Sequence, residues 1–130
     1  GVNGGGLEVD GPTAIRDTVF TGNSAASGGG LYGGGNYPGY GYTLTASGCT
    51  FTGNTAGVKG GGIDNEGAAT LSECTLSGNT AGSAGGGIFN AGDLTINDST
   101  ILYNVAPIGA DIDDIGITTL NDSKVGVIGH

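Results

Sequence analysis

Gly60-Gly61-Gly62-Ile63, followed by Thr70-Leu71-Ser72-Glu73-Cys74-Thr75-Leu76-Ser77-Gly78-Asn79, forms a unit that the rest of the chain repeats. The glycine triplet also begins at Gly4, Gly28 and Gly85, and a degenerate copy begins at Gly109. Three of the four steps between successive triplets are 24 or 25 residues. The closing asparagine recurs at a similar step. A period near 25 residues with abundant glycine is typical of a solenoid, in which each coil buries its apolar side chains against its neighbours.

Small or apolar residues alternate with polar ones inside each unit, as in Cys74-Thr75-Leu76-Ser77, and this two-residue period indicates strands. Aligned copies keep the size and polarity of equivalent residues. The aligned columns are Thr18, Cys49, Cys74, Ser99, Ser123; Phe20, Phe51, Leu76, Ile101, Val125; Ile15, Ala46, Leu71, Ile96, Leu120; and Leu7, Leu31, Ile63, Ile88, Ile112. We therefore expect an all-β, single-stranded parallel β-helix, with equivalent residues stacked at the roughly 4.8 Å spacing of paired strands.

The repeat predicts one domain of about five coils, over residues 1–24, 25–56, 57–81, 82–106 and 107–130. The second coil is longer because of an insertion at residues 33–41. In the fifth coil, Ile128 aligns with the asparagine of the earlier coils. No amphipathic helix or polar cap follows, so both ends are expected to be open. Gly1 stands at a coil boundary, which suggests an excised or processed chain.

Composition excludes several classes of protein. Lys and Arg total 3 against 12 Asp and Glu, for a net charge of −9, and nucleic-acid binders need clustered basic residues. No run of 18 apolar residues is present, so no membrane span is expected. The 31 glycines do not indicate disorder, because the large apolar residues recur in register.

Two sets of residues are expected to be structural. The closing asparagines are predicted to form an amide ladder at a corner of the coil: Asn23, Asn54, Asn79 and Asn104. Cys49 and Cys74 occupy the same column in adjacent coils, where either a disulfide or two stacked, buried thiols is compatible with the spacing.

The insertion and its flanks contain four of the five tyrosines, Tyr32, Tyr37, Tyr40 and Tyr42. Insertions in solenoids map to an exposed face that is often the binding face. These tyrosines are therefore candidates for stacking on glycan rings or for packing against a neighbouring subunit. The alternative is a glycine loop whose tyrosines lie on the rod without binding anything.

The acidic residues offer two hypotheses. Glu73, Asp98 and Asp122 precede the Cys/Ser column and should stack, so that Ca²⁺ could bridge two coils; the alternative is exposed, screened carboxylates. Asp113-Asp114 resembles the paired aspartates of polygalacturonase-like enzymes, but the companion motifs are absent and the only histidine is His130. We expect no enzymatic activity and no obligatory cofactor.

Threonine columns suggest a further alternative, because ranks of threonine on a flat β-solenoid face can match the ice lattice. The columns are Thr50, Thr75, Thr100 and Thr45, Thr70, Thr95, Thr119. Outward threonine is also simply a favourable strand residue, and that interpretation is preferred.

The pairing of the glycine triplet with Phe20-Thr21-Gly22-Asn23 and Phe51-Thr52-Gly53-Asn54 resembles the repeats of chlamydial polymorphic outer-membrane proteins and related bacterial and archaeal surface proteins. The resemblance implies a right-handed parallel β-helix at a cell surface or outside the cell, serving adhesion or structure. We therefore expect a structural subunit whose open ends join head to tail into a filament or surface layer. The alternatives are a glycan-binding adhesin fragment, and less plausibly an ice-binding or polysaccharide-degrading protein.

Overall fold

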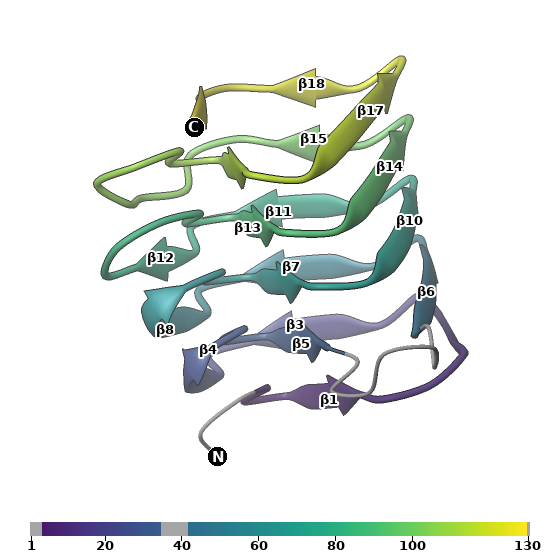
Figure 1. Cartoon of the computed structure of the whole chain (residues 1–130), viewed down its shortest axis with the longest axis horizontal. Helices are drawn as coiled ribbons and strands as arrows, with labels where there is room; N and C mark the ends of the chain where they lie inside the picture. The colour runs from purple at the N-terminus through teal and green to yellow at the C-terminus, as the bar shows by residue number, and fades with distance from the viewer. Residues whose placement is uncertain (1–3, 35–41, 130) are drawn as a thin grey trace.

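The computed structural model describes residues 4–34 and 42–129, and in these ranges the chain contains strands and no helix. The chain winds upward in flat coils, and equivalent strands of successive coils lie one above another (Figure 1). All strand pairs are parallel, and each strand pairs with its equivalent in the next coil. The fold is the parallel β-helix that the periodicity predicts.

Four parallel sheets form the walls of the helix. Sheet I contains β1 (Leu7–Val9), β5 (Leu31–Gly33), β9 (Ile63–Asn65), β13 (Ile88–Asn90), β16 (Ile112–Asp114) and β19 (Ile128–Gly129). Sheet II contains β2 (Thr13–Arg16), β6 (Thr43–Ser47), β10 (Ala68–Ser72), β14 (Asp93–Asn97) and β17 (Ile117–Asn121). Sheet III contains β3 (Val19–Thr21), β7 (Thr50–Thr52), β11 (Thr75–Ser77), β15 (Thr100–Ile101) and β18 (Lys124–Val125). Sheet IV contains β4 (Ser24–Ser27), β8 (Thr55–Lys59) and β12 (Thr80–Ala81).

The strand register confirms the apolar columns. Phe51 pairs with Phe20 on one side and Leu76 on the other, and the column continues through Ile101 to Val125. The Phe20 and Phe51 rings stack face to face with centroids 4.5 Å apart. Side chains of the middle coils, such as Leu71 and Ile88, are fully buried. Burial of repeated columns against one another stabilises coils that are too thin to have a core of their own.

The glycine triplets are required by the backbone at each return to sheet I. Gly60 has a φ of +68°, a conformation that glycine adopts without strain. A Cβ at Gly62 would lie only 2.7 Å from the Gly87 carbonyl oxygen of the next coil and 3.4 Å from Asn79. The third glycine therefore lets successive coils approach closely and leaves room for the closing asparagine.

One alignment from the sequence is wrong. Ile128 does not replace the closing asparagine; it pairs with Ile112 and begins a sixth level of sheet I. Only two residues separate Val125 from Ile128, so the chain crosses directly from sheet III to sheet I and skips the side formed by sheet IV. The upper face of the stack is therefore stepped, with one strand more in sheet I than in sheet II.

Candidate functional site

The four closing asparagines lie in one column and form a continuous hydrogen-bonded ladder. The side-chain Nδ2 of Asn23 donates to Oδ1 of Asn54 at 3.0 Å, and Asn54 donates in the same way to Asn79 at 3.0 Å. Asn79 in turn donates to Asn104 at 2.9 Å. Each Oδ1 also accepts the backbone N–H of the asparagine one coil below. These buried amides satisfy one another and the corner backbone.

The ladder ends on a carboxylate that sequence alignment does not place there. Oδ1 of Asp111 accepts both the backbone N–H and the Nδ2 of Asn104, at 3.1 and 2.9 Å. Its Oδ2 accepts the N–H of Val127 at 2.7 Å. Asp111 occupies the position of the third glycine of the triplet. The shortened last coil has no asparagine in the ladder column, so the side chain of Asp111, seven residues after Asn104, fills the next ladder position.

A second ladder runs through sheet I and was missed by the sequence analysis. Tyr42 donates its hydroxyl to Oδ1 of Asn65 at 2.6 Å, Asn65 donates to Asn90 at 2.8 Å, and Asn90 donates to Asp114 at 3.0 Å. Asn65, Asn90 and Asp114 each stand two positions before a glycine whose N–H donates to their side-chain oxygen, as Gly92 does to Asn90. The repeated Asn/Asp-x-Gly at steps of 25 and 24 residues was the available signal.

Two of the proposed binding tyrosines are not exposed. Tyr42 is 1% exposed and lies in the core, where burial raises the pKa of its hydroxyl. Tyr32 is also buried, in the outward column of sheet I, and its pKa is raised by burial and then by the charge of Glu66. Composition misled here, because an aromatic beside a glycine loop can equally turn inward. Tyr37 and Tyr40 lie outside the described residues.

The acidic column is explained by backbone geometry. Glu73, Asp98 and Asp122 stack as expected, and all three have positive φ values, of 52°, 48° and 48°. The equivalent positions in the first two coils are Asp17 and Gly48, which share that conformation. Asp tolerates left-handed backbone better than most residues do. In residues 4–34 and 42–129, no group of three or more His, Cys, Asp or Glu side chains is arranged to hold a metal ion.

The structure also places the cysteines, the paired aspartates and the threonine columns. Cys49 and Cys74 are buried free thiols in adjacent coils, and burial raises the pKa of Cys74. Asp113 and Asp114 are successive strand residues and so point to opposite faces of sheet I, with Asp114 held by Asn90. The two threonine columns lie on different walls, sheets II and III.

Asp64 is the most unusual ionisable group of the described chain. It is 0% exposed, lies between Tyr32 and Phe89 in the outward column of sheet I, and neither carboxyl oxygen has a hydrogen-bond partner among the described residues. Burial, followed by the charge of Glu66, raises its pKa to about 8, and Lys59 opposes this shift.

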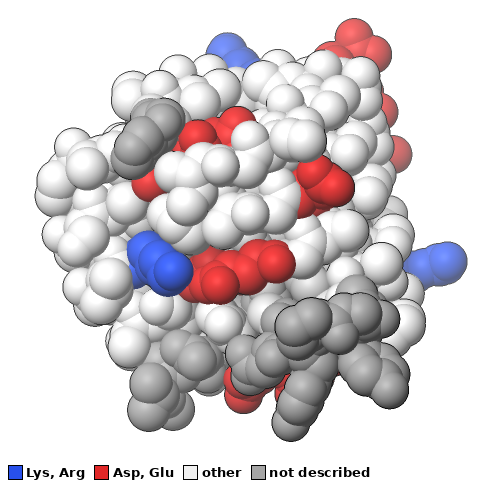
Figure 2. Space-filling view, in the orientation of Figure 1, with Lys and Arg blue, Asp and Glu red and all other residues white. Residues whose placement is uncertain are grey.

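Lys59 and Glu66 flank Asp64 at the surface. Their side chains form an ion pair at 3.3 Å, and the Lys59 ammonium also lies 4.6 Å from the centre of the Phe89 ring. Figure 2 shows acidic side chains gathered on this face with few basic ones beside them.

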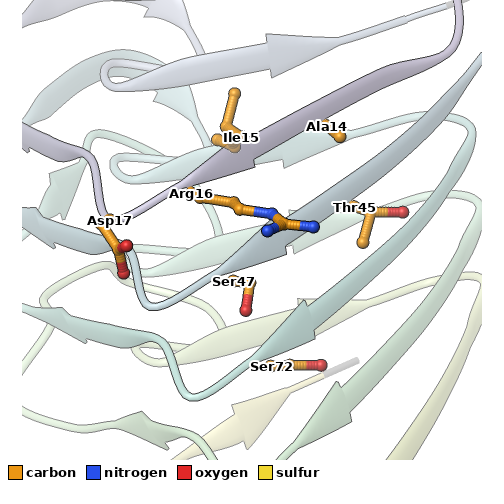
Figure 3. Close-up of a pocket in the computed structure, with 7 residues that line it drawn as sticks. All are labelled: Ala14, Ile15, Arg16, Asp17, Thr45, Ser47 and Ser72. Carbon is orange, nitrogen blue, oxygen red and sulfur yellow. The ribbon is translucent and has the colours of Figure 1, made fainter.

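A hollow of about 370 Å³ with a mixed polar and apolar lining lies on the outer wall of sheet II. Its lining comes from three successive coils: Ala14, Ile15, Arg16 and Asp17 from the first, Thr45 and Ser47 from the second, and Ser72 from the third. Figure 3 shows the Arg16 side chain extended across this wall above the two serines. Sequence analysis missed the hollow, because its residues are ordinary strand residues in three different repeats.

The family comparison agrees with the repeat pattern. The model of the Chlamydia polymorphic membrane protein repeat matches residues 17–34, 48–66 and 73–91, which together cover less than half of the chain. No curated protein and no solved structure matches the chain significantly. Within the described ranges, no helix is long and apolar enough to cross a membrane. The chain is a parallel β-helix, three segments of which match the Chlamydia polymorphic membrane protein repeat.

Proposed function

We propose that the chain is a non-enzymatic structural segment of a cell-surface β-helix, and that copies of it associate end to end. The repeat match supports the surface location, since the matched repeat is that of a membrane protein. The use of the polar side chains supports a structural role. The asparagine side chains find their hydrogen-bond partners in neighbouring coils of the same chain. The acidic corner residues are accounted for by their left-handed backbone conformation.

The upper face of the stack carries the proposal of association. Leu120 and Ile128 belong to apolar columns whose middle members are fully buried, yet at the top of the described stack they are 40% and 49% exposed. The strands β17 and β18 are edge strands with one unpaired side. At the lower face, Ile15 and Leu7 end the same columns. A second copy placed head to tail would continue the columns and supply paired strands.

The step in the upper face sets the mode of association. β19 already occupies the level of sheet I that β1 of an incoming copy would need if its β2 paired with β17. The upper end of one copy and the lower end of the next therefore cannot pair strands in all sheets at once. We expect β19 to be displaced when β1 of the next copy docks. Until it is displaced, β19 opposes association.

Sedimentation velocity over a range of protein concentrations tests this proposal. Wild-type chain should associate with increasing concentration, and Leu120→Lys should remain monomeric because a charge would have to be buried in the joint. Val58→Lys, at an exposed site on the side of the stack, is the matched control and should associate normally. Removal of residues 127–130 should promote association. Monomeric wild-type chain at high concentration, or association unaffected by Leu120→Lys, would contradict the proposal.

A further inference from the structure

The hollow on sheet II has the dimensions of a small-molecule site and lies on the outer wall at the lower end of the stack, where β2 is the edge strand. Its volume of about 370 Å³ is enough for one sugar residue. The small side chains of Ala14, Ser47 and Ser72 form the bottom of the hollow, and the longer Arg16 side chain lies beside them. The strands of this wall, β2, β6 and β10, pair in continuous register, so the positions of the lining residues are set by the fold before any ligand binds.

Arg16 has binding capacity that the described chain does not use. In the described ranges the ion pair is that of Lys59 with Glu66, and no side-chain hydrogen bond involves the Arg16 guanidinium. A guanidinium offers five N–H donors in a planar fork that fits a carboxylate with two parallel hydrogen bonds. Arg16 is thus the one cation in the hollow and faces solvent.

Hydroxyl groups are aligned with Arg16. Ser47 pairs with Arg16 across β2 and β6, and Ser72 pairs with Ser47 across β6 and β10. Each step is about 4.8 Å, close to the width of a sugar ring. Among the described residues, neither serine hydroxyl has a hydrogen-bond partner, whereas the backbone carbonyls of both serines are used within the sheet and its corners. A ligand anchored on Arg16 would meet both hydroxyls.

Asp17 restricts the ligand further. Its carboxylate is directed toward Gly48, at the edge of the hollow, where a Cβ on that glycine would lie 2.5 Å from Oδ1. A carboxylate accepts hydrogen bonds from ligand hydroxyls but repels a second negative charge. The net charge of −9 likewise disfavours polyanions. The hollow therefore suits a ligand with one negative charge beside Arg16 and neutral hydroxyl groups elsewhere.

We infer that this hollow binds a sugar acid, with the ligand carboxylate on Arg16 and its hydroxyls on Ser47, Ser72 and Asp17. The shallow, solvent-exposed geometry sets an affinity on the order of millimolar for a single sugar residue. Repetition of the chain along an assembled surface would raise the effective affinity for a glycan that carries such residues. One chain supplies all of the binding residues, so the test below needs no second copy.

Titration of ¹⁵N-labelled chain with D-glucuronate, followed by NMR, tests the inference. The amide signals of Ser47 and Ser72 should shift in a saturable manner. Arg16→Gln should weaken binding about tenfold, the loss expected for a charge-assisted hydrogen-bonded pair. Lys124→Gln is the matched control, since it removes one positive charge from β18, outside the hollow, and should leave the affinity unchanged. Unshifted signals elsewhere in the spectrum show that each variant is folded.

Three further probes separate the sources of binding. D-Glucose lacks the carboxylate, acetate lacks the hydroxyls, and sulfate is a simple anion, and each should bind at least several-fold more weakly than D-glucuronate. Acetate or sulfate binding as tightly as glucuronate would overturn the sugar-acid assignment in favour of a plain anion site. Equal binding of glucose, absence of shifts at Ser47 and Ser72, or an affinity unaffected by Arg16→Gln would overturn the inference altogether.

Discussion

Replacing Asp64 by asparagine should remove a pH-dependent loss of stability from the β-helix. The folded chain holds this carboxyl group in a fully buried position with a pKa of about 8, against an ordinary value of 3.8. Between these two values the native state keeps a proton that the unfolded chain releases. The free energy of unfolding should therefore be highest below pH 3.8, fall as pH rises, and level off above about pH 8.

The size of the effect follows from the two pKa values. Each pH unit between them lowers the free energy of unfolding by about 1.4 kcal/mol. At pH 7 the wild-type chain has therefore lost about 4 kcal/mol relative to a form that is neutral at this position. Asp64→Asn has nearly the same shape and no charge. A buried amide without a partner costs about 1–3 kcal/mol, but this cost does not change with pH.

Urea unfolding at several pH values between 4.5 and 8.5 measures this difference. We expect the stability of Asp64→Asn relative to wild type to rise steadily with pH, by several kcal/mol over the range. Asp122→Asn is the control, since it removes the same charge from an exposed corner. Asparagine also tolerates the left-handed backbone conformation at that corner. A difference between wild type and Asp64→Asn that is constant with pH would refute the reasoning.

Three further predictions concern the ladders and the glycines. Asn79→Ala should lower the free energy of unfolding by about 3 kcal/mol or more in urea titrations, because the buried Phe51 carbonyl and Asn54 amide lose their partners; a loss below about 1 kcal/mol would contradict this. Asp111→Asn should loosen the last coil, because an amide N–H₂ would face the Val127 N–H, and hydrogen exchange should rise there while the middle coils stay protected. Gly62→Ala should destabilise strongly in thermal melts through its contact with the next coil's backbone, whereas Gly57→Ala, with 3.9 Å of clearance, should be tolerated; equal melting temperatures would argue against close coil packing.

The fold and its structural columns are predictable from sequence because both follow from periodicity. A 25-residue step with two-residue alternation leaves one way to bury Phe51 and Leu76, namely one above the other. The same step aligns the closing asparagines, whose ladder needs only that equivalent side chains stack. The Asn65 ladder carried the same signal in its Asn-x-Gly repeat and was accessible to the same reasoning.

The remaining features arise from contacts between positions that are not equivalent in the repeat. Asp111 completes the asparagine ladder only because the last coil is short, which places its carboxylate one level above Asn104. Asp64 is ionisable and outward in the strand pattern, and its burial depends on the aromatic rings of Tyr32 and Phe89 in adjacent coils. The hollow beside Arg16 joins residues of three coils. Periodicity specifies which residues stack, whereas depth, charge environment and shape depend on neighbours in three dimensions.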